Sequence, residues 1–291
     1  MDMIAKFQNV LREKDIIAIP GVQDCLAARV AERAGADVCY LTGFGVVGST
    51  LGIPDIGLFS LDELAERARN IAGCVNIPVL CDIDTGFGGP LNIRRTINLM
   101  ERAGIVGALI EDQDSAHKHC SEMNLHISLV SAEQMELRIK AACEARNNKG
   151  FVIIARCDAK DLGMDEVKRR IHRYLSAGAD LVLLTQKYTL EEYADFAGEF
   201  RGKLVLTGGQ SEYEPWNRPL KEYASMGVKA VFYPSVMLGA AVRAMEGVLT
   251  PLKTKGQMTT KLLKETIHDV PYISELLGYS ECCSFKDRFE A

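Results

Sequence analysis

Two acidic residues follow a short apolar run near the first third of the chain. The run Ile77–Cys81 leads directly into Asp82 and Asp84, and a glycine-rich turn comes next. In a β-strand the side chains of residues i and i+2 lie on one face, so the two carboxylates would point the same way at the strand's end. Hard oxygen ligands with room for water suit Mg²⁺ better than Zn²⁺. The pattern predicts a magnesium site.

Four further segments carry groups that could complete such a site. They contribute an acid, a cysteine, an arginine and a threonine-glycine turn, and they are Ile110–Gln113, Lys118–Cys120, Ala155–Asp158 and Tyr40–Gly43. A carboxylate next to a fixed guanidinium would form a metal site with an anion clamp. A thiol close by could donate a proton, because its ordinary pKa is about 8.5.

The elements that must position these residues repeat in a regular order. Eight short apolar runs are typical of strands, and stretches with apolar spacing near 3.6 separate them. We expect strands at Ile16–Pro20, Val38–Thr42, Pro78–Ile83, Gly107–Glu111, Val152–Cys157, Leu181–Thr185, Leu204–Thr207 and Ala230–Tyr233. We expect helices at Cys25–Ala34, Leu61–Cys74, Asn92–Ala103, Ala132–Arg146, Asp165–Ser176, Leu190–Ala197, Leu220–Met226 and Leu238–Val248.

This alternation favours a parallel sheet, and eight strand–helix units favour a (β/α)₈ TIM barrel. A doubly wound open sheet is the alternative, although no GxGxxG motif follows the first strand. Active sites of such barrels lie at the carboxyl ends of the strands. That rule selects Thr42–Gly45, Asp82, Asp84, Glu111, Arg156, Thr185 and Thr207.

Bulk properties exclude several classes of partner. The net charge is −5 with no basic block, so we expect no nucleic acid partner. No apolar stretch reaches the roughly 18–20 residues of a membrane span, and we see no signal peptide. Nine cysteines, an odd number and mostly in apolar segments, are typical of a reduced protein. We therefore expect a cytoplasmic location and no membrane partner.

Two segments stand apart from the strand–helix units. The long polar stretch Asp114–Ser131 follows the fourth strand, where a long loop is often a lid. The last segment, Lys253–Ala291, has amphipathic helical patterns that need a partner surface. We expect residues 1–252 to form the catalytic barrel and residues 253–291 a helical extension that packs on another subunit.

In this order, the segments resemble the isocitrate lyase/phosphoenolpyruvate mutase superfamily, in particular its methylisocitrate lyase and 2,3-dimethylmalate lyase types. The resemblance extends from about Phe7 to Phe289 and includes Pro20–Asp24, Leu51–Gly57, Asp82–Gly88 and Tyr233-Pro234. It implies a TIM barrel whose last helix is exchanged between subunits, in a homotetramer built as a dimer of dimers. It also implies a Mg²⁺ cofactor, for which Mn²⁺ could substitute, and a small carboxylic acid substrate.

The resemblance also implies roles for individual residues. Asp82 would bind the metal directly, with Asp84 and Glu111 holding it through water. Catalysis would involve Cys120 as the acid that protonates the departing carbanion, Arg156, and Asp55 near the metal and the substrate oxygen. The substrate would contact Thr42, Gly43, Phe44, Asp82, Arg156, Thr185 and Thr207. The implied activity is cleavage of a 2-hydroxy acid to pyruvate and a carboxylic acid through an enolate-like intermediate.

The chain departs from the family pattern at several positions. Ser121-Glu122 replace a Gly-His pair, and Thr185, Thr207 and Gln210 stand where lyases of tricarboxylates carry Glu, Asn and Glu. We therefore expect a leaving acid with one carboxylate, such as propionate from a 2,3-dialkylmalate. An oxaloacetate decarboxylase or hydrolase, a phosphonomutase of the carboxyvinyl-carboxyphosphonate phosphorylmutase kind, and a barrel that binds a metabolite without turnover remain alternatives.

Overall fold

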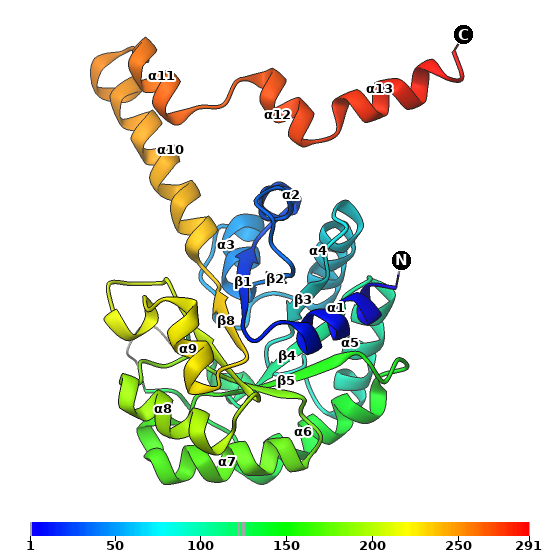
Figure 1. The fold of residues 1–291 in the computed structure, drawn as a ribbon, viewed down its shortest axis with the longest axis vertical. Helices are drawn as coiled ribbons and strands as arrows, with labels where there is room; N and C mark the ends of the chain where they lie inside the picture. Colours follow the sequence, from blue (N-terminus) through cyan, green and yellow to red (C-terminus); the bar gives the residue numbers. More distant parts are fainter. Residues whose placement is uncertain (1, 121–122, 124–125, 291) are drawn as a thin grey trace.

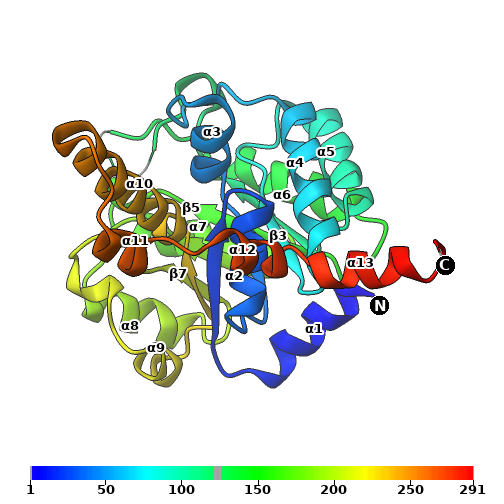
Figure 2. The same cartoon turned by 90° about the horizontal axis from the view of Figure 1, so that it is seen from above.

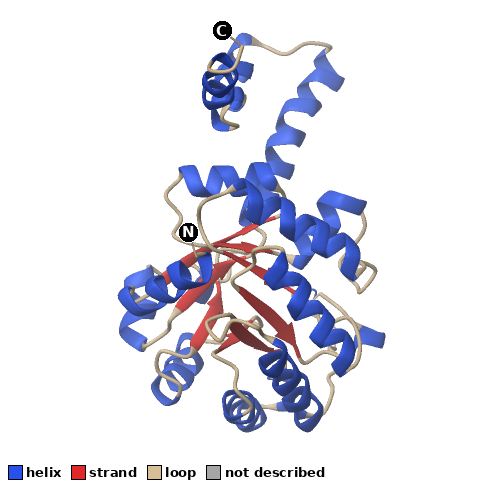
Figure 3. Cartoon of the chain, turned by 90° about the vertical axis from the view of Figure 1, so that its right-hand side faces the viewer, coloured by secondary structure: helices blue, strands red, loops and turns tan. Residues whose placement is uncertain are grey.

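Eight parallel strands close into a barrel in the computed structural model, which describes residues 2–120, 123 and 126–290. Each strand pairs with the next along the chain, and β1 pairs with β8 through Ile17 and Ala230 to close the ring (Figures 1 and 3). The strands are β1 Ile17–Val22, β2 Cys39–Leu41, β3 Val79–Asp82, β4 Gly107–Glu111, β5 Val152–Cys157, β6 Leu181–Leu184, β7 Leu204–Thr207 and β8 Ala230–Tyr233. The TIM barrel is confirmed, and the open sheet is excluded.

Alternate side chains of the strands divide between two layers of packing. The inward side chains, among them Tyr40, Leu80 and Phe232, form a cluster inside the barrel. The outward side chains pack against the surrounding helices in a second, larger cluster. A filled interior leaves the carboxyl ends of the strands as the open mouth of the barrel.

Helices cover the outside of the barrel (Figure 3). They are α1 Met3–Glu13, α2 Cys25–Arg33, α3 Gly43–Leu51, α4 Leu61–Cys74, α5 Pro90–Arg102, α6 Ala132–Ala145, α7 Met164–Ser176, α8 Leu190–Glu199 and α9 Leu220–Met226. Gly35 and Gly178 follow α2 and α7 with φ of 85° and 108°. These are left-handed conformations, in which a glycine commonly ends a helix.

The amino-acid pattern alone did not predict α1 and α3. The helix α3 begins at Gly43, directly after β2 and its N-cap residue Thr42. Its sequence Gly-Phe-Gly-Val-Val-Gly contains three glycines, which disfavour a helix by roughly 1 kcal/mol each. Burial of Val46 and Val47 against the barrel outweighs that cost. Strand β2 is correspondingly shorter than expected.

The chain leaves the barrel along one long helix. Helix α10, Val236–Lys255, is continuous across the expected boundary between residues 252 and 253. Helices α11 Thr260–Thr266, α12 Val270–Leu276 and α13 Tyr279–Asp287 follow as an arm above α2 (Figures 1 and 2). The arm contacts the barrel where the Arg33 guanidinium lies 4.5 Å from the ring centre of Tyr272. Within the described chain, no helix is both long and apolar enough to cross a membrane.

Candidate active site

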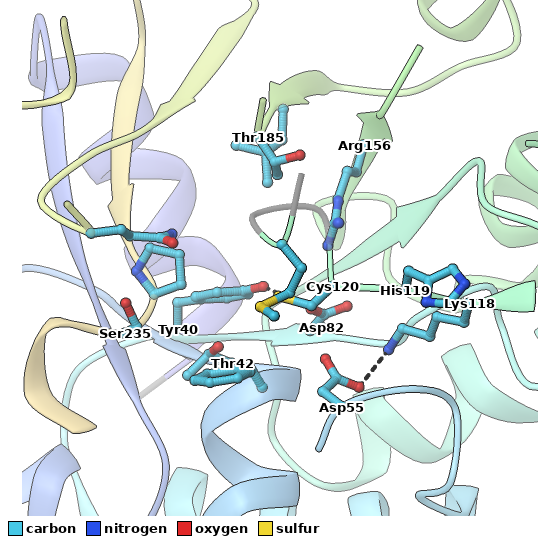
Figure 4. Close-up of a pocket in the computed structure, with 15 residues that line it drawn as sticks. Tyr40, Thr42, Asp55, Asp82, Lys118, His119, Cys120, Arg156, Thr185 and Ser235 are labelled. Carbon is cyan, nitrogen blue, oxygen red and sulfur yellow. Dashed lines mark hydrogen bonds and ion pairs between the residues drawn. The ribbon is translucent and has the colours of Figure 1, made fainter. Parts of the chain in front are cut away.

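A cavity of about 240 Å³ opens at the carboxyl ends of the strands (Figure 4). It is lined by Tyr40, Thr42, Phe44, Asp55, Asp82, Lys118, His119, Cys120, Met123, Arg156, Leu183, Thr185, Gln210, Pro234 and Ser235. Seven of the expected site residues are therefore brought together here, namely Thr42, Phe44, Asp55, Asp82, Cys120, Arg156 and Thr185. The described lining does not include the other four, which are Gly43, Asp84, Glu111 and Thr207.

Asp82 and Asp84 meet through a turn and not through a shared strand face. Strand β3 ends at Asp82, and Asp84 lies beyond it with φ of +49°, a left-handed conformation that Asp tolerates better than most residues. The Asp82 carboxylate accepts hydrogen bonds from the Tyr40 hydroxyl and from the Asp84 amide, each at 3.0 Å. The two carboxylates still lie on the same side, since a Cβ atom at Gly43 would be 3.2 Å from Asp82 Oδ2 and 3.5 Å from Asp84 Oδ1, but a turn and not the strand's alternation brings them together.

Lys118 joins two acids that the sequence keeps far apart. Its ammonium lies 2.7 Å from Asp55 Oδ1 and 2.5 Å from Asp84 Oδ1, and its side chain is only 5% exposed. Before the structure, only its place next to His119 and Cys120 distinguished this lysine from the others. Its position shows that the segment carrying Cys120 is held by charge at the edge of the acidic cluster.

Arg156 is held as a fixed cation on β5. Its Nε and Nη2 atoms donate to the two oxygens of Asp158 at 3.1 and 2.7 Å, and Nη1 lies 3.0 Å from Glu111 Oε2. Asp158 also accepts hydrogen bonds from Thr185 and from Gln113. A forked contact of this kind fixes the plane of the guanidinium, so that it presents a directed positive charge to the cavity.

Burial sets the protonation behaviour of the acids. Desolvation raises the pKa of Asp82 to about 6, with the nearby Asp84 adding to the shift. Desolvation likewise raises the pKa of Glu111 to about 8, although Arg156 opposes it. Burial alone would lower the pKa of Lys118, but Asp84 and its neighbouring acids outweigh that effect and raise it. Lys118 is therefore always protonated. The positive charges near Asp82 and Glu111 are too few to offset the burial of these acids.

The donor set fits a divalent cation. Both carboxylate oxygens of Glu111 are buried and accept no hydrogen bond from the described residues, although Oε2 forms the ion pair with Arg156 at 3.0 Å. Lys118 and Arg156 supply two positive charges to a group of acids comprising Asp55, Asp82, Asp84, Glu111 and Asp158. Over the described part of the chain, no three His, Cys, Asp or Glu side chains converge enough to enclose a metal ion. Carboxylate oxygens of this kind are the donors that Mg²⁺ prefers.

A row of backbone N–H groups borders the acidic cluster. Thr42 is the N-cap of α3, so the first amides of that helix, at Gly43 and Phe44, have no partner within the helix. A Cβ atom at Gly43 would lie 3.2 Å from Asp82 Oδ2, so glycine lets the helix start approach the carboxylate closely. A helix N-terminus binds carboxylates well. The expected carboxylate cradle is thus placed next to the expected metal ligand.

Cys120 lies on the cavity wall, partly exposed, two residues after Lys118 (Figure 4). The replaced Gly-His pair, Ser121-Glu122, lies outside the described residues. Thr185 and Leu183 line the cavity, while Thr207 is buried at the end of β7 and is not part of the described lining. These positions put a thiol within the same cavity as the metal-site acids and the arginine.

A TIM barrel with buried acids, a clamped arginine and an amide cradle at its mouth has the chemical groups needed to bind a small carboxylate. Comparison with known proteins agrees. Residues 7–252 match the family model of phosphoenolpyruvate phosphomutase. The chain is 34% identical to 2,3-dimethylmalate lyase of Eubacterium barkeri over 279 residues, which is 96% of this chain and 95% of that protein.

Two other similar proteins broaden the picture. A 2-methylisocitrate lyase of Aeropyrum pernix is 33% identical, with 94% of this chain and 87% of that protein covered. The structure of a phosphonopyruvate hydrolase with oxalate and Mg²⁺ superposes with a TM-score of 0.88 at 28% identity, and both chains are covered in full. The chain belongs to the phosphoenolpyruvate mutase/isocitrate lyase superfamily. It is an enzyme, a carbon–carbon lyase of the kind these relatives represent.

Proposed function

We propose that the enzyme is Mg²⁺-dependent and cleaves an alkylmalate-type 2-hydroxy acid to pyruvate and a monocarboxylic acid. The division of the cavity is the observation that carries this proposal. The lining that β3, β4, β5 and the residues after them contribute includes the charged groups of Asp82, Lys118 and Arg156. The described lining that β6, β7, β8 and the residues after them contribute is neutral and consists of Leu183, Thr185, Gln210, Pro234 and Ser235. A second or third carboxylate on the leaving acid would find no cation there.

In this proposal the protein's own groups bind the pyruvate-forming half first. The amides of Gly43 and Phe44 receive its carboxylate, as a helix start does for anions. Asp82 would hold the metal directly, and Asp84 and Glu111 would hold it through water. When bound, Mg²⁺ would acidify the 2-hydroxyl group and offset the negative charge that develops on its oxygen.

The residues then divide the proton transfers between them. We assign Asp55, which lines the cavity, as the acceptor of the hydroxyl proton. As the C2–C3 bond breaks, C2 becomes the carbonyl carbon of pyruvate and the bond's electron pair passes to C3. The enediolate of the leaving acid forms against the Arg156 guanidinium, which is fixed before the reaction starts. Cys120 donates its thiol proton to C3, which gives the neutral C–H of the released acid.

A pyruvate-release assay tests the proposal directly. The full chain with Mg²⁺ is given 2,3-dimethylmalate, 2-methylisocitrate, citramalate, isocitrate and oxaloacetate, with Cys120→Ser assayed beside it. Pyruvate from a branched malate, with kcat lower by about 10²–10⁴-fold in the variant, is the expected result. Equal activity on 2-methylisocitrate would contradict the single-carboxylate assignment.

Decarboxylation or hydrolysis of oxaloacetate, or a phosphonomutase reaction, is the second candidate. The same neutral lining favours this candidate, because these substrates also carry no additional carboxylate that would need a cation there. A phosphonopyruvate hydrolase also shares the fold. Pyruvate from oxaloacetate alone, unaffected by Cys120→Ser, would establish the decarboxylase. The thiol would then be a bystander.

We further propose that residues 253–291 pack on a second subunit, in a homotetramer, and that the enzyme works in the cytoplasm. All residues of α10 to α13 are described, and none of them is buried. Large apolar side chains such as Leu249, Ile267 and Phe285 remain exposed on these helices. Light scattering of the full chain should give four times the monomer mass, whereas a monomer would contradict the assembly.

A further inference from the structure

Gln113 is a buried amide that joins two separate parts of the site. It follows β4 and is 0% exposed. Its Nε2 atom donates to Asp158 Oδ2 at 2.7 Å, and its Oε1 atom accepts from the backbone N–H of His119 at 3.0 Å. One end of the side chain therefore touches the group that clamps Arg156. The other touches the segment that carries Lys118 and Cys120.

The chemistry at the two ends fixes how the amide must be turned. A backbone N–H can only donate, so it needs the amide oxygen. The Asp158 carboxylate, which already accepts from Arg156 and Thr185, needs the amide nitrogen. Glutamate would repel Asp158, and an apolar side chain would leave two buried groups unpaired. Only glutamine of this length satisfies both ends.

The base of the following loop is anchored independently of this side chain. The Asp114 amide donates to the Ser128 carbonyl at 2.8 Å, and the Val130 amide donates to the Asp112 carbonyl at 3.0 Å. Arg138 also donates to the Gln113 carbonyl at 2.9 Å. Loss of the amide contacts should therefore leave the loop's base in place and release only the segment nearer Cys120.

We propose that Gln113 is a positioning residue that sets the place of Cys120 relative to Arg156. The link between the two parts of the site consists of the two hydrogen bonds of Gln113 and is a property of the fold. Its importance for proton transfer rests on the proposed lyase function. Within that function, the thiol must reach the carbon whose charge develops against the guanidinium. Misplacement by about 1 Å can cost about 10²-fold in rate.

The test measures the position of Cys120 without requiring turnover. The full-length protein, free of substrate, is treated with iodoacetamide, and alkylation of each cysteine-containing peptide is followed by mass spectrometry. In Gln113→Met, which loses both hydrogen bonds, and in the size-matched Gln113→Glu, whose carboxylate is repelled by Asp158, we expect Cys120 to react about tenfold faster. Oxalate, the probe for the Arg156 side, should bind within about threefold of wild type, because Asp158 still clamps the guanidinium.

Two controls separate a specific link from general loosening. Gln8→Met removes a comparable bond, from Nε2 to the Gly150 carbonyl at 2.7 Å, at the opposite end of the barrel. It should leave Cys120 alkylation unchanged. Cys143 on α6, whose thiol contacts the Gly178 carbonyl at 3.2 Å, should react at its wild-type rate in every variant. Unchanged Cys120 reactivity in both Gln113 variants, or equal acceleration of Cys143, would overturn the proposal.

Kinetics then connect the link to catalysis. With the substrate found by the pyruvate assay, Gln113→Met should lower kcat by about 10²-fold and change KM little, because the metal-site acids and the amide cradle remain. A larger effect on KM than on kcat would overturn the positioning role. If the wild-type enzyme cleaves none of the acids, the proposed function fails, while the alkylation result still decides whether the link exists.

Discussion

The two halves of the barrel mouth are built from opposite kinds of side chain. Where β3, β4 and β5 end, the inward positions are Asp82, Glu111 and Arg156, and all three are charged. Where β6 and β7 end, the corresponding positions are Thr185 and Thr207. Inward placement follows from strand alternation, since Leu109 and Val205 lie inside the barrel two residues earlier.

The contrast indicates how a symmetric scaffold separates two tasks. Buried charges stabilise one another only when they are neighbours, so the acids and the arginine occupy adjacent strands. The remaining strands are free of that constraint and can shape the space for the part of the substrate that differs between relatives. Substitutions in the two halves should therefore have effects of very different size.

The largest effect is expected on the charged side, from Asp82→Asn. The amide keeps the shape of the side chain but removes the charge that would hold the metal. We expect activity to fall by at least about 10³-fold, with loss of Mg²⁺ binding in calorimetry. Asp62→Asn, at an acid that is 80% exposed on α4, is the matched control and should change little. A variant retaining a tenth of wild-type activity would remove Asp82 from the metal site.

The second-largest loss of activity is expected from Arg156→Lys. Lysine keeps the charge but cannot make the forked contact with Asp158 while also facing Glu111. We expect kcat/KM to fall by about 10²-fold in the pyruvate assay. Arg146→Lys changes an arginine that pairs with Asp180 at 2.8 Å, at the opposite end of the barrel. Equal losses in both variants would mean that Arg156 acts only through stability.

Thr185→Val tests the residue at which the charged half of the barrel mouth meets the neutral half. The substitution removes the hydroxyl that donates to Asp158 without changing the side chain's shape much. We expect a loss of about 1–2 kcal/mol in the free energy of unfolding and about a tenfold lower kcat/KM. Thr185→Ser should keep most of the stability and most of the kcat/KM, because serine also has a hydroxyl that can donate to Asp158. Full activity in Thr185→Val would place this residue wholly on the neutral side.

The smallest effect is expected from Thr207→Val. The Thr207 hydroxyl is buried without a hydrogen-bond partner among the described residues. Its replacement by a methyl group should leave kcat/KM within about threefold and raise the free energy of unfolding by up to about 1 kcal/mol, as judged by urea denaturation. A tenfold loss of activity would show that this hydroxyl contacts the substrate, and the neutral half would then take part in binding.

The sequence predicts the scaffold better than the contacts within the site. Strands β4 and β5 begin and end where the apolar pattern places them, because parallel strands buried on both faces give continuous apolar runs. Helix α3 could not be predicted from propensity, since its glycines serve the close approach to Asp82 and not the helix.

Local patterns also could not reveal the roles of Lys118 and Gln113. Lys118 meets Asp55 across 63 residues of chain, and Gln113 meets Asp158 across 45. Such contacts depend on how the barrel brings strand ends together, and the residue types alone do not specify them. The positions of Asp82 and Arg156 at the barrel mouth could be predicted because each lies at the carboxyl end of an apolar strand.

Glu111 carries a consequence for how this enzyme can change over evolutionary time. Its carboxylate is fully buried, Oε1 has no hydrogen-bond partner in the described chain, and only the ion pair of Oε2 with Arg156 at 3.0 Å offsets the cost of burying the charge. Glu111→Gln or a similar neutral replacement should therefore make the protein more resistant to heat while it makes the enzyme poorer. If Glu111 helps to hold the metal as proposed, selection for stability alone would replace it, and its presence would mark a position where activity is retained at the expense of stability.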